Sequence, residues 1–357
     1  MIAFLTLIIW TIVSYDLCKR VNRRDVNRIY CWNMFFATLL LQGFRSIYIG
    51  GVDTSLVYAR GFERAMITPF NKMSVVFGKD ILFYYLTKCF TYICTDFHVY
   101  IFVISAFVLG SFSIFIYRHS DRPVFSYIIY YALGYYAIGF QMLRHVMALS
   151  ILLLAYDFIL ERKPLKFIVI VLLASCFHSS ALIFLIAYPL SKMKIGFKQW
   201  IAIIVAVASV FIARGKIAGI INALLLGMDR YSRYSENATQ LSLMGAFILI
   251  CVYIVSFIFA YPAYKEDDEL KMLLNLSVIS IAFMTLVTVV GEFHRISMFF
   301  GIYNTVLLPK AWKRYQARDD RLKAVYLLGI NAVFVAYFLL YGLGNYSLSV
   351  YRFFWMD

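Results

Sequence analysis

Residues 141–181 read QMLRHVMALSILLLAYDFILERKPLKFIVIVLLASCFHSSA. This stretch contains two apolar runs separated by the short charged loop Glu161-Arg162-Lys163-Pro164. Arg144 and His145 stand at the start of the first run, and His178-Ser179-Ser180 interrupt the second. Polar groups inside such runs are costly in a membrane and are therefore candidates for function. The stretch predicts membrane helices that carry an arginine and histidines to one face of a bilayer.

The composition supports a membrane protein. Of 357 residues, 63% are hydrophobic and 15% are charged, whereas a soluble domain is about half apolar and a quarter charged. We therefore expect an all-α, polytopic helical membrane protein with residues 1–357 as a single integral membrane domain. The net charge of +15 does not indicate nucleic acid, because most cations lie in short loops between apolar runs. Six scattered cysteines without a CxxC pair give no reason to expect a metal or another cofactor.

The apolar runs predict about twelve membrane segments. Their approximate ranges are 1–15, 29–46, 97–117, 124–140, 143–160, two arms within 165–191, 199–213, 241–263, 270–290, 296–309 and 324–343. The positive-inside rule places the basic loops around Arg23, Lys163, Lys194 and Lys313 in the cytoplasm.

Two longer connections then lie on the outer side, at about 47–96 and 214–240. The first includes Asp53 and the second includes Tyr231. Residues 80–94 alternate polar and aromatic groups at helical spacing, which predicts an interfacial helix.

The run 165–191 has two interpretations. As a helical hairpin that turns at His178-Ser179-Ser180, it leaves Lys192 and Lys194 inside, like the other basic loops. Each arm is then about 13 residues long, too short to cross a core of ~30 Å, so the arms must pack within protein. As a single long helix, the run places both lysines outside. The hairpin is favoured because it places these lysines on the same side of the membrane as the other basic loops.

Polar residues gather at the outward ends of these segments. They are Arg45, Asp53, Arg144, His145, His178, Glu292, His294 and Arg295. Guanidinium groups bind phosphate bidentately and keep their charge, and histidine transfers protons near neutral pH. The two carboxylates either orient a base or a sugar hydroxyl, or form salt bridges with neighbouring arginines. This set suits a lipid-linked phosphate or pyrophosphate.

Four stretches resemble the EpsG/Wzy-like polysaccharide polymerases of bacterial capsule, exopolysaccharide and O-antigen pathways. They are Arg45 followed by Gly51-Val52-Asp53-Thr54 and Tyr58; Arg144-His145-Val146-Met147-Ala148; Ala174-Ser175-Cys176-Phe177-His178-Ser179-Ser180-Ala181; and Arg295 leading to Phe299-Phe300 and Leu308-Pro309. Their order and spacing match the family over most of the chain. His145 departs from the family, which has glutamine at that position.

The resemblance implies a metal-independent membrane glycosyltransferase. Such an enzyme joins oligosaccharide repeat units carried on undecaprenyl pyrophosphate, at the outer face of the bacterial cytoplasmic (inner) membrane. It implies Arg144, His178 and Arg295 as catalytic residues, with the arginines on pyrophosphate and His178 as base or as the group that orients the acceptor. The substrate-binding residues would be Arg45, Asp53, Thr54, Tyr58, His145, Glu292 and His294. A flippase and a chain-length regulator of the same pathway would be partners, together with membrane lipids.

Two other function classes stay open. A flippase or transporter of lipid-linked oligosaccharide also needs cationic groups within the membrane, but the chain shows no internal repeat of the kind found in transporters. A membrane acyltransferase acting on surface polysaccharide also uses histidine, but an inward-facing acyl donor calls for catalytic groups nearer the cytoplasm.

Overall fold

The computed structural model describes residues 2–193 except 22, 52 and 79, then residues 239–260, 266–287, 291–315, 320–342 and 350–356, with isolated positions between these ranges. Within them the chain is helical and has no strand, which confirms the all-α class. The described residues form two compact units. Unit 1 combines residues 1–182 with 316–357, and unit 2 spans residues 183–315. The expectation of a single domain stays a prediction.

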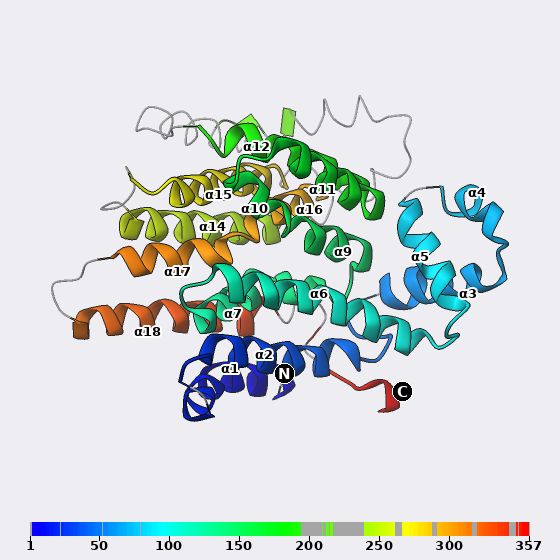
Figure 1. The fold of residues 1–357 in the computed structure, drawn as a ribbon, viewed down its shortest axis with the longest axis horizontal. Helices are drawn as coiled ribbons and strands as arrows, with labels where there is room; N and C mark the ends of the chain where they lie inside the picture. The colour runs from blue at the N-terminus through cyan, green and yellow to red at the C-terminus, as the bar shows by residue number, and fades with distance from the viewer. Residues whose placement is uncertain are drawn as a thin grey trace. The chain divides into compact units, whose positions relative to one another are not determined.

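The helices carry the labels of Figure 1. They are α1 (Ile2–Val21), α2 (Val26–Gly43), α3 (Arg60–Ile67), α4 (Met73–Phe77), α5 (Ile81–Thr91), α6 (Phe97–His119), α7 (Pro123–Ala132), α8 (Tyr135–Ile138), α9 (Leu143–Leu152), α10 (Ala155–Leu160), α11 (Pro164–Phe177), α12 (Ala187–Leu190), α14 (Thr239–Ala260), α15 (Asp268–Leu286), α16 (Phe293–Gly301), α17 (Asn304–Arg314) and α18 (Asp320–Tyr337). A π-helical turn, Asp53–Ala59, and a 3₁₀ segment, Ser179–Ile186, complete the elements near the polar residues.

Five helical segments in the described residues are long and apolar enough to cross a membrane. They are Ile2–Val21, Phe97–His119, Leu143–Leu160, Asp268–Leu286 and Lys323–Leu340. Shorter apolar helices, such as Pro164–Phe177, would need protein neighbours to lie at membrane depth. A multi-pass membrane protein is thus supported, while the number of twelve segments stays a prediction. The predicted helix 199–213 and the outer segment 214–240 lie almost wholly outside the described residues.

In unit 1, α2 and α6 pack antiparallel. Gly43 near the end of α2 faces Phe102 in the first turns of α6, and Phe44 lies 5.0 Å from the same ring between centroids. At the opposite end, Gly110 in the second half of α6 faces Phe35 in α2. Small residues at both points let the two helices approach closely, as is common in membrane bundles.

Several basic loops of unit 1 lie together at one end, opposite the polar residues of the candidate site. At one end, which we call the basic end, α1, α6 and α10 finish in Lys19, Arg118 and the loop containing Lys163, and His119 Nε2 lies 3.2 Å from Asp157 Oδ1. At the other end, the site end, lie Arg45, Asp80, Arg144 and His178. Helices α3, α4 and α5 gather at the site end, as Figure 1 shows on the right. Which side of the membrane each end faces stays a prediction.

The predicted single helix 124–140 is wrong in detail. It is divided into α7 and α8 at Gly134, whose φ of +80° is a left-handed conformation suited to glycine. Buried tyrosines hold the break in place, and Tyr136 donates a hydrogen bond of 2.8 Å to the Thr38 carbonyl. The predicted helix 296–309 is likewise divided, into α16 and α17.

The run 165–191 breaks where its polar residues predict. Helix α11 ends at His178, whose φ of −153° and ψ of 110° are extended, and a 3₁₀ segment follows from Ser179. The alternative of one uninterrupted helix is therefore wrong. Whether the chain reverses direction here stays a prediction, since residues 183 onward belong to unit 2.

Unit 2 packs α14, α16 and α17 against α15. Acidic residues at the start of α15 pair with cations of α17: Arg314 donates to Asp267, the N-cap of α15, at 2.7 Å, and Lys310 lies 3.0 Å from Glu269 in its first turn. Ser280 and Ser297 exchange buried hydrogen bonds between α15 and α16. Such reciprocal serine contacts let two membrane helices approach without leaving polar groups unsatisfied.

The predicted cytoplasmic position of the basic end can be tested by cysteine labelling. In a variant that keeps Cys89 as its single cysteine, a membrane-impermeant maleimide should react in intact cells, because Cys89 is exposed on α5 at the site end. A single cysteine at position 163 should react only after the membrane is permeabilised. Labelling of both positions from the same side would contradict the opposite-ends arrangement.

Candidate functional site

The site end of unit 1 is organised around Asp80, a residue outside the predicted site. Asp80 precedes α5 with φ +54°, a left-handed conformation that aspartate tolerates better than most residues. Its side chain is only 6% exposed. The Arg144 Nη1 donates to Asp80 Oδ2 at 2.8 Å, and the Ser179 amide donates to Oδ1 at 3.0 Å. One carboxylate thus joins the starts of α5 and α9 to the end of α11.

The Asp80 carboxyl is held ionised by these contacts. Burial alone would raise the pKa of Asp80, but the His178 imidazole, the Ser179 amide and the charge of Arg144 act in the opposite direction and outweigh it. The pKa of Asp80 therefore lies below its usual value, and the group carries its negative charge at neutral pH.

Arg144 is held by aromatic rings as well as by Asp80. The guanidinium carbon lies 5.9 Å from the centre of the Tyr58 ring and 5.7 Å from that of Tyr84, within cation–π range. The arginine side chain is still 23% exposed. A planar guanidinium fixed by two rings and one carboxylate keeps further N–H donors for an anion such as phosphate.

His178 stands next to the same carboxylate. Its Nδ1 lies 3.6 Å from Asp80 Oδ2, and its side chain is 15% exposed. His145, in the first turn of α9, is almost fully buried and places its ring edge-to-face with that of His178, with 5.5 Å between centroids. If Nδ1 carries the proton that faces Asp80, then Nε2 is the basic nitrogen, which is the arrangement that a general base requires.

Arg45 and Thr54 converge on a backbone carbonyl. Thr54 Oγ1 donates to the Phe140 oxygen at 2.7 Å, and Arg45 Nη2 lies 3.5 Å from the same atom. Arg45 also donates to the carbonyl of Gln42 and lies 5.3 Å over the Phe140 ring. Both side chains are fully buried. Their geometry favours positioning the 139–142 turn that leads into Arg144 over direct contact with a substrate.

Gly50 explains how the loop after α2 reaches this turn. Its φ is +90°, and a Cβ there would lie 2.6 Å from the Phe140 oxygen. Only glycine allows so close an approach of the two backbones. Gly50 and Thr54 therefore both pack on the Phe140 carbonyl, in the turn that leads to the Arg144 helix. Asp53 itself is partly exposed at the start of the π-helical turn, and Tyr58 is buried at the end of that turn.

Three predicted site residues lie in unit 2. Arg295 Nη1 forms an ion pair with Glu292 Oε2 at 2.8 Å, within one turn at the start of α16. Burial and the positive charge of Arg295 lower the pKa of His294 to about 4, so this imidazole is neutral at pH 7. Glu292 thus forms a salt bridge with a neighbouring arginine, one of the two roles that the sequence suggested for this carboxylate. The convergence of Arg295 with Arg144 stays a prediction.

Unit 1 therefore joins Arg144, His178, His145 and Tyr58 around a residue that the sequence did not single out. The signal for Asp80 is faint: Gly78-Lys79-Asp80 precedes the predicted interfacial helix, and aspartate is common before any helix. In the described part of the chain, no group of three or more His, Cys, Asp or Glu side chains is arranged to hold a metal ion.

The comparison with protein families gives one match. The model of the EpsG family matches residues 28–353, which include every residue of the site described above. A comparison with curated proteins and with solved structures gives no match. The match extends over most of the sequence and includes both units, and the all-helical architecture agrees with it. The chain therefore belongs to the EpsG family.

Proposed function

We propose that this chain polymerises lipid-linked oligosaccharide repeat units at the outer face of the bacterial cytoplasmic membrane. Family membership supports a polysaccharide polymerase-type role. The observation that carries the proposal is the Arg144–Asp80–His178 cluster, which joins an anion-binding group to a proton acceptor at the end of unit 1 opposite its basic loops. Both groups are needed to displace a pyrophosphate with a sugar hydroxyl.

In the proposed reaction, the growing glycan moves from undecaprenyl pyrophosphate to a new lipid-linked unit. The acceptor hydroxyl oxygen attacks the anomeric carbon of the growing chain. The bond from that carbon to the pyrophosphate oxygen breaks, and the electron pair leaves with the pyrophosphate. The proton of the hydroxyl passes to His178 as general base. Each turnover thus forms one glycosidic bond and releases one undecaprenyl pyrophosphate.

Arg144 stabilises the charge that develops on the leaving pyrophosphate. Its guanidinium is oriented before substrate binds, because Asp80 and the two tyrosine rings fix its plane. Pre-oriented donors are effective because they need little rearrangement as charge develops. The same carboxylate lies 3.6 Å from His178 Nδ1, so Asp80 stands beside both the anion-binding group and the base. We assign Asp80 as a positioning residue that acts through Arg144 and His178.

The function is tested by the lipid-linked glycans of cells that lack the chain. Single repeat units on the carrier should accumulate on the outer leaflet, and polymer should disappear. Purified chain reconstituted with a lipid-linked repeat unit should form polymer without a nucleotide sugar. Retention of the units on the cytoplasmic leaflet would instead indicate a flippase. Normal polymer lacking acyl groups would indicate an acyltransferase.

Asp80→Asn tests the positioning role. Asparagine tolerates the left-handed backbone and can still accept the Ser179 amide, but it lacks the charge that faces Arg144 and His178. We expect about tenfold slower polymerisation per inserted protein, since a hydrogen bond to a charged group contributes about 1.5 kcal/mol or more. The measurement is the initial rate at saturating lipid-linked unit, with the KM determined separately.

Asp96→Asn is the matched control for this exchange. Asp96 caps α6 by accepting the His98 amide at 2.7 Å, and asparagine caps a helix equally well. This variant should polymerise at the normal rate. An unchanged rate in Asp80→Asn as well would remove Asp80 from the site.

A further inference from the structure

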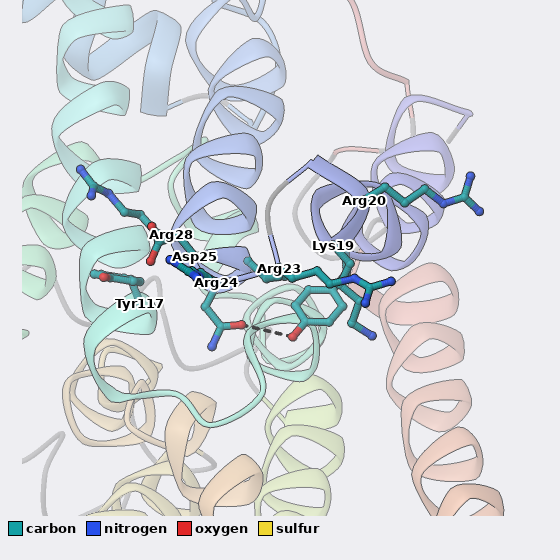
Figure 2. Close-up of a pocket in the computed structure, with 10 residues that line it drawn as sticks. Lys19, Arg20, Arg23, Arg24, Asp25, Arg28 and Tyr117 are labelled. Atoms are coloured by element: carbon teal, nitrogen blue, oxygen red, sulfur yellow. Dashed lines mark hydrogen bonds between the residues drawn. The ribbon is translucent and has the colours of Figure 1, made fainter.

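The basic end of unit 1 contains an open pocket of about 720 Å³ (Figure 2). It lies among the end of α1, the start of α2 and Tyr117 near the end of α6. Its lining includes five cationic side chains, Lys19, Arg20, Arg23, Arg24 and Arg28, and one carboxylate, Asp25. Figure 2 shows Arg28 and Tyr117 beside α6, whereas Arg20 points away on the opposite side. The lining is therefore strongly positive and faces away from the candidate catalytic cluster.

An apolar groove adjoins this pocket. It measures about 330 Å³ and lies between α2 and α6, with Cys31, Trp32, Phe35, Gly110 and Ile114 along it. Arg28 and Tyr117 line both the pocket and the groove, and Arg118 stands at the same end of the groove. A cationic pocket and an apolar groove thus share two lining residues.

We propose that these two compartments bind one anionic phospholipid of the bilayer. The phosphate would lie against Arg28 and Arg118, and one acyl chain would follow the groove between α2 and α6. The charge decides the class of ligand, since basic pockets between membrane helices attract anionic lipid headgroups. The apolar groove then distinguishes a lipid from a free anion, because only a lipid fills both compartments.

The groove has its shape because Gly110 lacks a side chain. A Cβ at this position would lie 3.6 Å from the Phe35 ring, an ordinary contact distance. A leucine there fits the helix backbone and directs its outer carbons into the space that the acyl chain would occupy. Gly110→Leu therefore closes the groove without altering any charge. Arg28→Gln and Arg118→Gln remove charge without closing the groove.

The test measures lipid retention by the purified full chain in detergent, by native mass spectrometry. Dioleoylphosphatidylglycerol is titrated against dioleoylphosphatidylcholine, which has the same chains without net charge. Arg28→Gln and Arg118→Gln should each weaken phosphatidylglycerol retention about fivefold, and about 25-fold together, since each cation near a membrane surface contributes on the order of 1 kcal/mol. Gly110→Leu should weaken it at least as much as one arginine exchange. Arg60→Gln, on exposed α3 at the site end, should change nothing.

Each further outcome also decides the proposal. Equal retention of the two phospholipids by the unaltered chain would overturn it. Displacement of phosphatidylglycerol by glycerophosphoglycerol at similar concentration would reduce the feature to an anion site. Displacement by undecaprenyl phosphate at much lower concentration would replace the phospholipid with the isoprenoid carrier. If Gly110→Leu unfolds, Ile114→Gln, on the exposed face of α6, tests the groove instead. Unchanged phosphatidylglycerol retention by this variant would contradict the binding of an acyl chain in the groove.

Discussion

His178→Gln should insert into the membrane in normal amounts and polymerise more slowly by a factor on the order of 10²–10⁴. Glutamine keeps a hydrogen-bonding side chain at the end of α11, so the extended backbone that ends this helix should persist. It cannot accept and release a proton near pH 7, which is the property that the proposed base requires. The measurement is polymer formed per inserted protein, from a purified lipid-linked unit.

Two further variants separate catalysis from folding. If His178 only supports the break after α11, glutamine should be largely tolerated and His178→Leu should lower the amount of folded protein. His98→Gln makes the same exchange at the same end of unit 1, where His98 stacks on Phe354, and should polymerise normally. Near-normal polymer from His178→Gln would contradict the assignment of this residue as the general base.

Arg144→Lys should be the second severe loss, about 10- to 100-fold in polymerisation rate. Lysine keeps the positive charge, so Asp80 retains a counterion in its nearly buried position. It has no planar fork to bind Asp80 and a phosphate together, and it cannot lie between the Tyr58 and Tyr84 rings as guanidinium does. One hydrogen bond to a charged group contributes about 1.5–3 kcal/mol, which sets this range.

Arg64→Lys is the matched exchange, because Arg64 is an exposed residue of α3 near the same end of unit 1. It should leave both the amount of protein and the rate unchanged. Inorganic pyrophosphate should inhibit the unaltered chain more strongly than Arg144→Lys. Full polymer from Arg144→Ala would exclude Arg144 from the site.

The sequence predicted the class of fold and two of the three residues at the centre of the cluster. Arg144 and His178 were recognisable because each interrupts an apolar run, where a polar group needs a reason. Asp80 was not, because it lies in a mixed segment where a carboxylate before a helix is ordinary. Its partners are 64 and 99 residues away along the chain, and only the tertiary structure brings them together.

Arg45 and Thr54 show a second limit. Their sequence context indicates polar residues at a helix end, but it does not say whether they face a ligand or the protein backbone. In the structure both are fully buried and turn toward the carbonyl of Phe140. The division of 124–140 was missed for a related reason: its residues are almost all apolar or aromatic, and only the left-handed Gly134 marks the turn.

The link between Asp80 and the end of α11 has a consequence for biosynthesis. Chains are made from the N-terminus, so Asp80 emerges from the ribosome well before Arg144 and the Ser179 amide exist. During that interval its carboxylate lacks both of these partners, although α5 can already bond to α6 through Thr87 and Tyr100. A nascent chain halted before residue 164 would contain every helix up to α10, but the Asp80 carboxylate would still lack the Ser179 amide and His178. Catalytic competence would thus be acquired late, only when α11 has been inserted.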